Sequence, residues 1–492
     1  MLKHLRQLAT ESVVYGLSGV LSRFLTIFLV PLYTLALTPA DYGTMSLIRN
    51  TAVLLGTCAS LALDSAAGRF YWDSEDPVSR KSALACWAWC YLTTTSLVAV
   101  AVIVFADNLS VKLVGTGAAA ASLRLAGVTL PLNVLGLVFM NRLRWQRRPW
   151  GVTAYALATS VITIVLTAVL VLRMHRGVEG VFLAQFVMSL ATTVCLIALV
   201  RDWIHPRYFE LNRLKAMVRY ALPLVPTVIG LWVVDVIDRY FLQVYASTTQ
   251  VGLYEIGYSI AAIVALGTGA FQQAWIPFAM SIQAAPEAKQ VYANTLIAYA
   301  WVGCLGCAGA AIFAPEVLRL LTTKAYYGAD SVVACLAFSY LLMGAGNIAA
   351  LGAAVTKKTV SLGIAVIGSA FGNIALNFLL VPSYGKDGAA WATLLSSTVV
   401  PAYLFYRSQK LYPIPYRFGK PILITAFALV IVKIGTNLSL DSLWLAIAGK
   451  AVLLSLFLPL LLLLRIVSIG DVRALMQGRV AWSPGVAVPE RR

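Results

Sequence analysis

The chain has 492 residues, of which 60% are hydrophobic and only 12% are charged. A mean hydropathy of +0.82 leaves too little polar surface for a soluble globular protein. In a soluble domain the net charge of +18 would favour nucleic acid as a partner, but here the basic residues lie mostly in short loops between apolar runs. Nucleic acid is therefore not an expected partner.

Continuous apolar runs of membrane-spanning length predict about 14 transmembrane helices. The runs are about twice as long as a barrel strand, so the sequence predicts an all-α polytopic membrane protein. In chain order, the predicted spans cover residues 12–37, 43–64, 83–106, 122–141, 150–172, 178–200, 219–244, 252–275, 291–313, 330–354, 360–381, 386–406, 421–438 and 442–464.

Most basic residues fall on one side of the predicted membrane, which places both termini in the cytoplasm. We expect the chain to be a multi-pass protein of the cytoplasmic (inner) membrane. Five segments follow from the order of the spans. They are an N-terminal six-helix bundle (1–204), a cytoplasmic amphipathic linker (205–218), a C-terminal six-helix bundle (219–410), two additional transmembrane helices (411–467) and a cytoplasmic tail (468–492).

An internal repeat predicts that the two bundles are pseudo-symmetric. Gly43 and Gly252 are 209 positions apart, and the Gly-x-x-Gly-x-x-x-Ala pattern that begins at Gly177 recurs 208 positions later from Gly385. Because each half has six predicted spans, both halves have the same orientation, and the symmetry axis is expected to run along the membrane normal.

Motifs for catalysis and metal binding are weak or absent in the sequence. No nucleotide-binding P-loop pattern occurs, and the three histidines lie outside the span interiors. Cys304 and Cys307 form a single Cys-x-x-Cys pair, which we interpret as core packing rather than a zinc site. Since no large loop offers room for an enzyme site, we expect no enzyme activity, no cofactor and no metal.

Charged residues inside the spans are the strongest functional signal, because a charge at the membrane centre costs about 2.5 to 3.5 kcal/mol on insertion scales. Arg23 lies near the middle of the first span. In the second span a stripe at helical spacing is charged at both ends and small between them: Arg49, Ala52, Gly56, Ser60 and Asp64. Small residues indicate either close helix packing or a cavity wall. The arginines favour a cavity, because a guanidinium is not buried in a tight seam without a partner.

The seventh span carries a cluster of Asp235, Asp238 and Arg239. Asp235 and Arg239 are four positions apart and are predicted to pair along the helix, which leaves Asp238 for another partner. Counting along the helix puts the cluster in the outer part of the membrane, where it is either a gate between bundles or a purely structural network. Arg23 and Arg49 have no acidic neighbour within four positions and are better candidates for binding phosphate.

Several other polar residues are candidates for roles between the bundles. Asp64, Arg69 and Glu255 are candidates for the same gate or ion-pair network as Asp235 and Asp238. Asn373 and Asn377 offer polar contacts to an ion or a sugar in the lumen, or alternatively hydrogen bonds between helices.

A series of short motifs is spread along the chain between residue 12 and about residue 406. They are Pro31-Leu32-Tyr33, Asp41-Tyr42-Gly43, Arg69-Phe70-Tyr71, Tyr220 to Pro226, Asp238-Arg239, Val251 to Tyr254, Thr356 to Thr359, Asn373, Asn377, and Val381 to Ala390. As a set, they resemble the bacterial polysaccharide transporters, the O-antigen-type oligosaccharide-lipid flippases.

This resemblance implies the fold of the multidrug, oligosaccharidyl-lipid and polysaccharide exporter superfamily, with alternating access between two bundles. It implies as substrate an oligosaccharide linked to undecaprenyl pyrophosphate, and a cationic lumen in which Arg23, Arg49 and Arg239 fit the role of binding it. The second bundle departs from that pattern, because Arg239 is its only intramembrane cation before Lys450.

Other partners and two alternative functions stay open. Besides the lipid-linked oligosaccharide and the lipid bilayer, H⁺ or Na⁺ and other polysaccharide-assembly membrane proteins are candidate partners. A cation-coupled multidrug exporter of the same fold is the first alternative, for which we expect an acidic lumen. A membrane glycosyltransferase or glycan polymerase is the second, and it is disfavoured by the lack of a large external loop.

Overall fold

The computed structural model describes residues 29–356, 358, 360–438 and 443–464. Every regular element within these residues is a helix. Eleven helices are long and apolar enough to span a membrane, or 12 when the bent pair α3 and α4 is counted as a span. The predicted all-α polytopic fold is confirmed. The first predicted span (12–37) lies mostly outside the described residues, and the predicted tail (468–492) lies wholly outside them.

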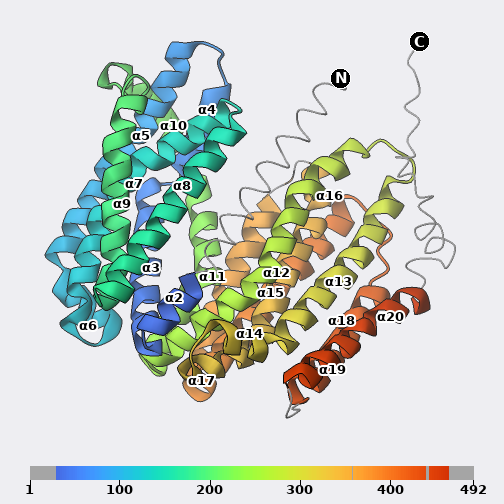
Figure 1. Cartoon of the computed structure of the whole chain (residues 1–492). Coiled ribbons are helices and arrows are strands. Elements are labelled where there is room, and N and C mark those ends of the chain that lie inside the picture. Colours follow the sequence, from blue (N-terminus) through green and yellow to red (C-terminus); the bar gives the residue numbers. More distant parts are fainter. Residues whose placement is uncertain (1–28, 357, 359, 439–442, 465–492) are drawn as a thin grey trace, which may run out of the picture.

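The N-terminal lobe consists of α3 to α9, preceded by the short helix α2 (Figure 1). Its elements are α2 (Leu29–Ala36), α3 (Pro39–Ser60), α4 (Leu63–Trp72), α5 (Pro77–Val104), α6 (Ala106–Val114), η1 (Gly117–Ala119), α7 (Ala120–Trp145), α8 (Pro149–Ala168), η2 (Val169–Arg173) and α9 (Gly177–Val200). Helices α3 and α4 meet at an angle of 45°.

The linker and the C-terminal lobe follow. The linker contains η3 (Pro206–Tyr208) and α10 (Leu211–Ala221), and η4 (Leu222–Leu224) leads into the C-terminal lobe. The elements of this lobe are α11 (Val225–Tyr245), α12 (Thr248–Ser281), α13 (Ala288–Ile312), α14 (Ala314–Leu321), η5 (Lys324–Val332), α15 (Val333–Ala349), α16 (Leu351–Val355) and α17 (Val360–Leu411). The additional helices α18 (Gly419–Asn437), α19 (Leu443–Ser455) and α20 (Phe457–Leu463) lie along α13 on the side of this lobe that faces away from the N-terminal lobe (Figure 1).

Helix α17 is a pair of antiparallel helices rather than one long helix. At about 1.5 Å per residue, its 52 residues would measure about 78 Å, more than twice the hydrocarbon thickness. The backbone leaves the helical region at Gly385, and Asn373 on one side of this break donates a hydrogen bond of 3.0 Å to the Ser396 hydroxyl on the other. The two halves therefore pack side by side and correspond to the two predicted spans 360–381 and 386–406.

The repeat seen in the sequence recurs in the backbone. Gly177, which begins α9, has φ +53°, and Gly385, which divides α17, has φ +54°. An L-residue other than glycine is strained in this left-handed region, so both turns depend on the missing Cβ. The two glycines occupy equivalent positions of the repeat, and each forms the same chain reversal in its own lobe.

Helices α3 and α12 begin at equivalent positions of the repeat and with the same capping chemistry. The Thr38 hydroxyl accepts a hydrogen bond of 3.2 Å from the Asp41 amide, and the Asp41 carboxylate accepts one of 3.1 Å from the Thr38 amide. In α12, the Ser247 hydroxyl accepts from the Gln250 amide at 3.3 Å. These side chains satisfy amide groups that the first turn of a helix leaves unpaired.

The lobes touch where α3 and α12 cross, near the N-terminal ends of both helices (Figure 1). A Cβ on Gly43 would collide with the Thr248 carbonyl oxygen, and a Cβ on Gly252 would collide with the Pro39 carbonyl oxygen. The two contacts are related by the repeat: Gly43 meets the residue four positions before Gly252, and Gly252 meets the residue four positions before Gly43. The repeat axis therefore passes through a crossing at which backbone meets backbone.

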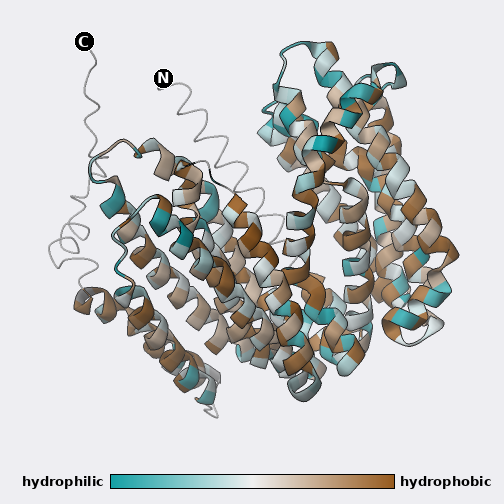
Figure 2. Ribbon diagram, turned by 180° about the vertical axis from the view of Figure 1, so that it is seen from behind, coloured by the Kyte–Doolittle hydropathy of each residue, from teal (hydrophilic) through white to brown (hydrophobic). Residues whose placement is uncertain are grey.

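The amphipathic helix α10 packs on the N-terminal lobe. Met217 and Ala221 on its apolar face are fully buried in a cluster with Tyr71 and Trp87 of α4 and α5. Elsewhere, hydrophobic residues predominate along the long helices, and hydrophilic residues gather toward helix ends and loops (Figure 2). This distribution is the one expected of helices surrounded by lipid.

Candidate functional site

The interface between the lobes contains a buried ion-pair network of four residues, Arg49, Asp238, Arg239 and Glu255, called here the interlobe network. Arg49 of α3 donates from Nη2 to Oε1 of Glu255 on α12, across the interface. Arg239 of α11 donates from Nε to the second Glu255 oxygen at 3.1 Å and from Nη1 to Asp238 at 2.8 Å. Two cations and two carboxylates thus neutralise one another inside the membrane, as such burial requires.

Tyrosines and a threonine complete the coordination of the network. The Tyr254 hydroxyl donates to Asp238, and the Thr393 hydroxyl of α17 donates to the same carboxylate oxygen at 3.1 Å. The Arg239 guanidinium lies 4.1 Å from the ring centroid of Tyr258 and 5.0 Å from that of Tyr254. These contacts hold the Arg239 side chain in place on both its polar edge and its flat face.

The predicted pairing of Asp235 with Arg239 through their side chains is wrong. Arg239 donates to the backbone carbonyl of Asp235, while the Asp235 carboxylate accepts a hydrogen bond of 2.6 Å from Tyr258. Arg239 instead uses the carboxylates of Asp238 and Glu255. Local spacing along α11 suggested the nearest acid, but Glu255 arrives from another helix with better access to the guanidinium.

The two arginines of the interlobe network differ in their exposure. The side chain of Arg239 is 2% exposed, whereas that of Arg49 is 41% exposed. Arg49 borders a cavity of ≈ 470 Å³, within the range of about 300–1,000 Å³ typical of small-molecule sites. Only Arg49 therefore combines a fixed carboxylate partner with N–H groups that remain accessible to a ligand.

The cavity lies mainly in the wall of the N-terminal lobe. Helices α3, α4, α5, α7 and α9 line it, and Val228 of α11 borders it from the C-terminal lobe. Its polar lining residues, apart from Arg49, include Thr57, Ser60, Asp64, Thr129, Asn133 and Gln185. Asn133 is fixed by a hydrogen bond of 2.8 Å from Ser189, so the wall presents amide and hydroxyl groups suited to a ligand rich in hydroxyls.

All five residues of the stripe in the second predicted span, from Arg49 to Asp64, border this cavity. Asp64 lies about 20 Å from Arg49 along the bent α3–α4 path, at the opposite end of the cavity. Arg69, farther along α4, pairs with Asp73 at 3.4 Å in an exposed position. The structure therefore separates Asp64 and Arg69 from the interlobe network.

Asn373 and Asn377 are fully buried between the two halves of α17. Asn377 donates to the Asn373 side chain at 3.0 Å, and its own Oδ1 is buried with no hydrogen-bond partner among the described residues. Neither residue borders the cavity. Arg23, the other predicted cation of the lumen, lies outside the described residues.

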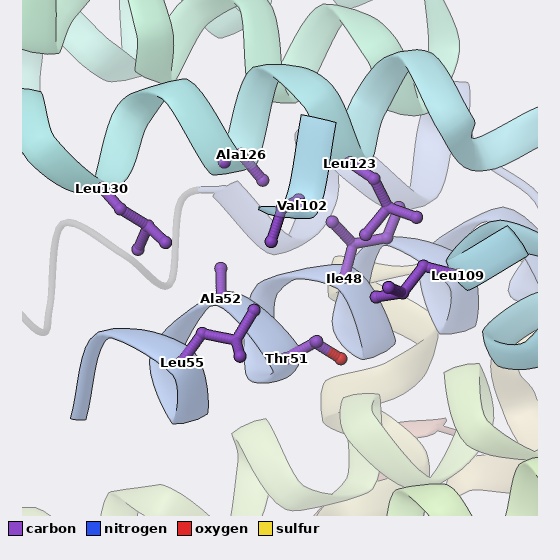
Figure 3. Close-up of a pocket in the computed structure, with 10 residues that line it drawn as sticks. Ile48, Thr51, Ala52, Leu55, Val102, Leu109, Leu123, Ala126 and Leu130 are labelled. Carbon is purple, nitrogen blue, oxygen red and sulfur yellow. The ribbon is translucent and has the colours of Figure 1, made fainter. Parts of the chain in front are cut away.

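A second hollow on another side of α3 is an ordinary packing gap. Figure 3 shows its lining, with Leu55 of α3, Val102 of α5 and Leu123 of α7 among the apolar side chains that enclose it. Its volume is ≈ 10 Å³, room for about one water molecule. It contributes to the contact between helices of the N-terminal lobe and is too small for a substrate.

Several residues of the site escaped sequence reasoning. Tyr254, Tyr258 and Thr393 coordinate the interlobe network, and Asn133 and Gln185 line the cavity. The polar residues on α7 and α9 carried a weak signal, because uncharged amides within apolar runs are uncommon. For the tyrosines no signal existed, since a buried aromatic ring is an ordinary feature of a packed helix.

Together, the fold and the site define a two-lobed helical membrane protein with a cavity of mixed polar and apolar lining, mainly in the N-terminal lobe. A family model described as "Polysaccharide biosynthesis protein" matches residues 8–283, which is more than half of the chain. The chain therefore belongs to the polysaccharide biosynthesis protein family, and the predicted family resemblance is confirmed.

A curated relative and two solved structures are similar to this chain. The relative, "Probable flippase AglR" of Haloferax volcanii, is 28% identical over 175 residues, which cover 33% of this chain and 35% of AglR. The chain thus matches about a third of the length of that relative.

The two solved structures show the fold. "Lipid II flippase MurJ, inward closed conformation" has a TM-score of 0.71 at 14% identity and covers 90% of this chain and 98% of its own. An inward-facing multidrug resistance MATE family transporter of the MOP superfamily has a TM-score of 0.66 at 15% identity, with 78% and 94% covered. At these identities the similarity shows that the chain shares their fold, and nothing about the ligand.

Proposed function

We propose that this protein is a flippase that moves a polyprenyl-pyrophosphate-linked oligosaccharide across the cytoplasmic membrane for polysaccharide biosynthesis. The observation that carries the proposal is the position of Arg49, an arginine that bridges the two lobes and is 41% exposed on a cavity of the N-terminal lobe in a polysaccharide-family protein. Arginine binds phosphate oxygens in a bidentate manner, and the neighbouring amides and hydroxyls suit a sugar.

The cavity removes the main barrier to flipping. A sugar that crosses hydrocarbon unaided loses hydrogen bonds to water at a cost of several kcal/mol for each hydroxyl group. In the cavity, Asn133, Gln185 and Ser60 offer replacement hydrogen bonds, while Arg49 takes the charge of the pyrophosphate. The polyprenyl chain stays in the bilayer throughout. Arg23 remains proposed as a further phosphate-binding cation, and Arg239 as a binder only after its own carboxylates release it.

The arrangement of the lobes supports alternating access. Their backbone crossing at Gly43 and Gly252 lies near the start of α3, whereas Asp64 borders the cavity at the start of α4. On the predicted positive-inside topology, the crossing lies on the outer side of the membrane. We assign this arrangement to the inward-facing state, from which the lobes rock to release the headgroup outside. Coupling to H⁺ or Na⁺, and contacts with other polysaccharide-assembly proteins, are part of the same proposal.

The test is headgroup transfer in proteoliposomes that contain a lipid-linked oligosaccharide. We expect the full chain to expose the headgroup to an impermeant probe at least tenfold faster than protein-free vesicles, and Arg23→Ala/Arg49→Ala to lose most of this rate. Arg124→Ala is the matched control, because Arg124 pairs with exposed Asp107 and does not border the cavity. An unchanged rate in a normally folded double variant would reject the phosphate-binding role.

A cation-coupled multidrug exporter is the second candidate, because the fold is shared with a multidrug transporter and Asp64 places a carboxylate on the cavity. Energised uptake of a cationic dye, without transfer of the lipid-linked headgroup, would favour it. For a glycosyltransferase or polymerase, the purified protein would have to form new glycosidic bonds, and we expect none.

A further inference from the structure

We propose that Glu255 is an exchangeable counter-ion of Arg49, which the phosphate of the substrate displaces, and that this exchange breaks the charge bridge between the lobes. The proposal rests on the proposed function and deepens it, because it makes opening of the outer side depend on a bound headgroup. Glu255 is then a positioning residue, acting on the substrate through Arg49.

The Arg49–Glu255 pair is the one ion pair between the two lobes within the described residues. The other polar links across the interface are uncharged. Thr51 and Tyr240 share a hydrogen bond of 2.8 Å, and the Tyr326 hydroxyl donates to the Leu37 carbonyl at 2.9 Å. The backbone crossing at the repeat glycines adds close contact but no charge. Removing the ion pair therefore changes the interface more than removing any other of these bonds.

Glu255 and Arg49 are held unequally. The Glu255 side chain is 5% exposed and has a second cation partner, Arg239, at 3.1 Å within its own lobe. Arg49 is 41% exposed, and its remaining N–H groups are accessible from the cavity. A dianionic phosphate that enters the cavity meets Arg49 first and can replace Glu255 on it, while Glu255 stays on the C-terminal lobe.

Charge balance then opposes opening of the empty protein. When the lobes are together, Arg49 and Arg239 balance the carboxylates of Glu255 and Asp238. When the lobes separate without a ligand, Arg239 alone faces both carboxylates, and Arg49 has lost its carboxylate partner. Among the described residues, the other groups near Glu255 carry no positive charge: Tyr42 and Ser46 on α3, Asp235 on α11 and Tyr340 on α15. A phosphate on Arg49 removes one of the two unpaired charges, so lobe separation is easier with the headgroup than without it.

The first test measures binding of inorganic pyrophosphate to the purified full chain by calorimetry. Because Glu255→Gln removes the competing carboxylate, we expect it to bind pyrophosphate at least fivefold more tightly than the natural sequence. Glu316→Gln is the matched control, because Glu316 also forms a largely buried carboxylate pair between separate helices, with Lys450 at 2.6 Å, and does not border the cavity. Equal or weaker binding by Glu255→Gln overturns the exchange and shows that Glu255 only orients Arg49.

The second test measures the separation of the lobes, first with the interlobe network intact and then in Glu255→Gln. Spin labels at Lys112→Cys on α6 and Arg319→Cys on α14, both exposed, report the distance between the lobes after the exposed Cys58 and Cys195 are replaced by serine. We expect pyrophosphate to shift the distribution toward longer distances. Glu255→Gln should show that shift without pyrophosphate.

The outcomes separate the two proposals. Pyrophosphate that binds without moving the labels overturns the exchange and leaves the phosphate site in place. Absence of pyrophosphate binding in the natural sequence and in Glu255→Gln contradicts the phosphate site itself, and the proposed function with it.

Discussion

The two lobes share their architecture and differ in their chemistry. The capping residues Thr38 and Ser247 are 209 positions apart, as are the glycines of the α3–α12 crossing, and Gly177 and Gly385 make the same left-handed turn. Such features define where helices begin, cross and reverse. They are retained in both halves because the backbone geometry requires them.

The charges do not follow the repeat. The position equivalent to Arg49 is Tyr258, and the position equivalent to Glu255 is Ser46. The C-terminal lobe buries Asp238, Arg239 and Glu255, whereas the N-terminal lobe presents its one network cation to the cavity. The comparison indicates a division of labour, in which the C-terminal lobe supplies fixed counter-charge and the N-terminal lobe supplies the ligand wall.

The largest difference between the lobes is expected in stability. Arg239→Ala leaves two buried carboxylates without their shared cation and should destabilise the protein by about 3–5 kcal/mol, so that little folded protein is recovered. Arg49→Ala should cost about 1 kcal/mol or less, because Glu255 retains Arg239. Thermal unfolding in detergent measures both. Equal losses would contradict the division of labour.

The crossing glycines should behave alike in the two halves. Gly43→Ala and Gly252→Ala each place a Cβ against a carbonyl oxygen of the other lobe, so we expect at least a tenfold loss of headgroup transfer for either. Gly306→Ala controls for the substitution itself, since Gly306 lies in a helix with no atom near a new Cβ. The control should keep its rate and gain a little stability, about 0.5–1 kcal/mol. A normal rate in both crossing variants would show that the contact is not needed.

The turn glycines offer a smaller and graded comparison. Gly177→Ala forces alanine into the left-handed region, at a cost of about 1–2 kcal/mol, but its Cβ meets no atom. Gly385→Ala has the same strain and in addition meets the Gln250 carboxamide, which accepts a hydrogen bond of 2.8 Å from the Lys386 amide. Unfolding temperatures should therefore fall further for Gly385→Ala. The reverse order would mean that Gln250 moves aside at no cost.

The smallest effect is expected at the far end of the cavity. Asp64→Asn removes a negative charge about 20 Å from Arg49 and should improve pyrophosphate affinity about twofold at 10 mM salt, where the Debye length is about 30 Å. At 150 mM salt, with a Debye length of about 8 Å, the gain should vanish. A gain that persists at high salt would place the bound anion closer to Asp64 than to Arg49.

The sequence predicted local features well. Apolar runs located the spans, including the two halves of α17, and 3.6-residue spacing grouped the stripe from Arg49 to Asp64 on one side of the chain. The partner of Arg49 could not be predicted in this way, because Glu255 is 206 positions distant and its approach depends on how two lobes pack. Neighbour rules along one helix therefore assigned Arg239 the wrong acid.

The binding site can be located in a density map of the full chain in lipid nanodiscs with a polyprenyl-pyrophosphate-linked disaccharide bound. We expect pyrophosphate oxygens within about 3.2 Å of the Arg49 guanidinium, sugar density along the wall that contains Asn133 and Gln185, and Glu255 bonded to Arg239 alone. Pyrophosphate located elsewhere, with the cavity empty and Arg49 still paired to Glu255, would contradict this expectation.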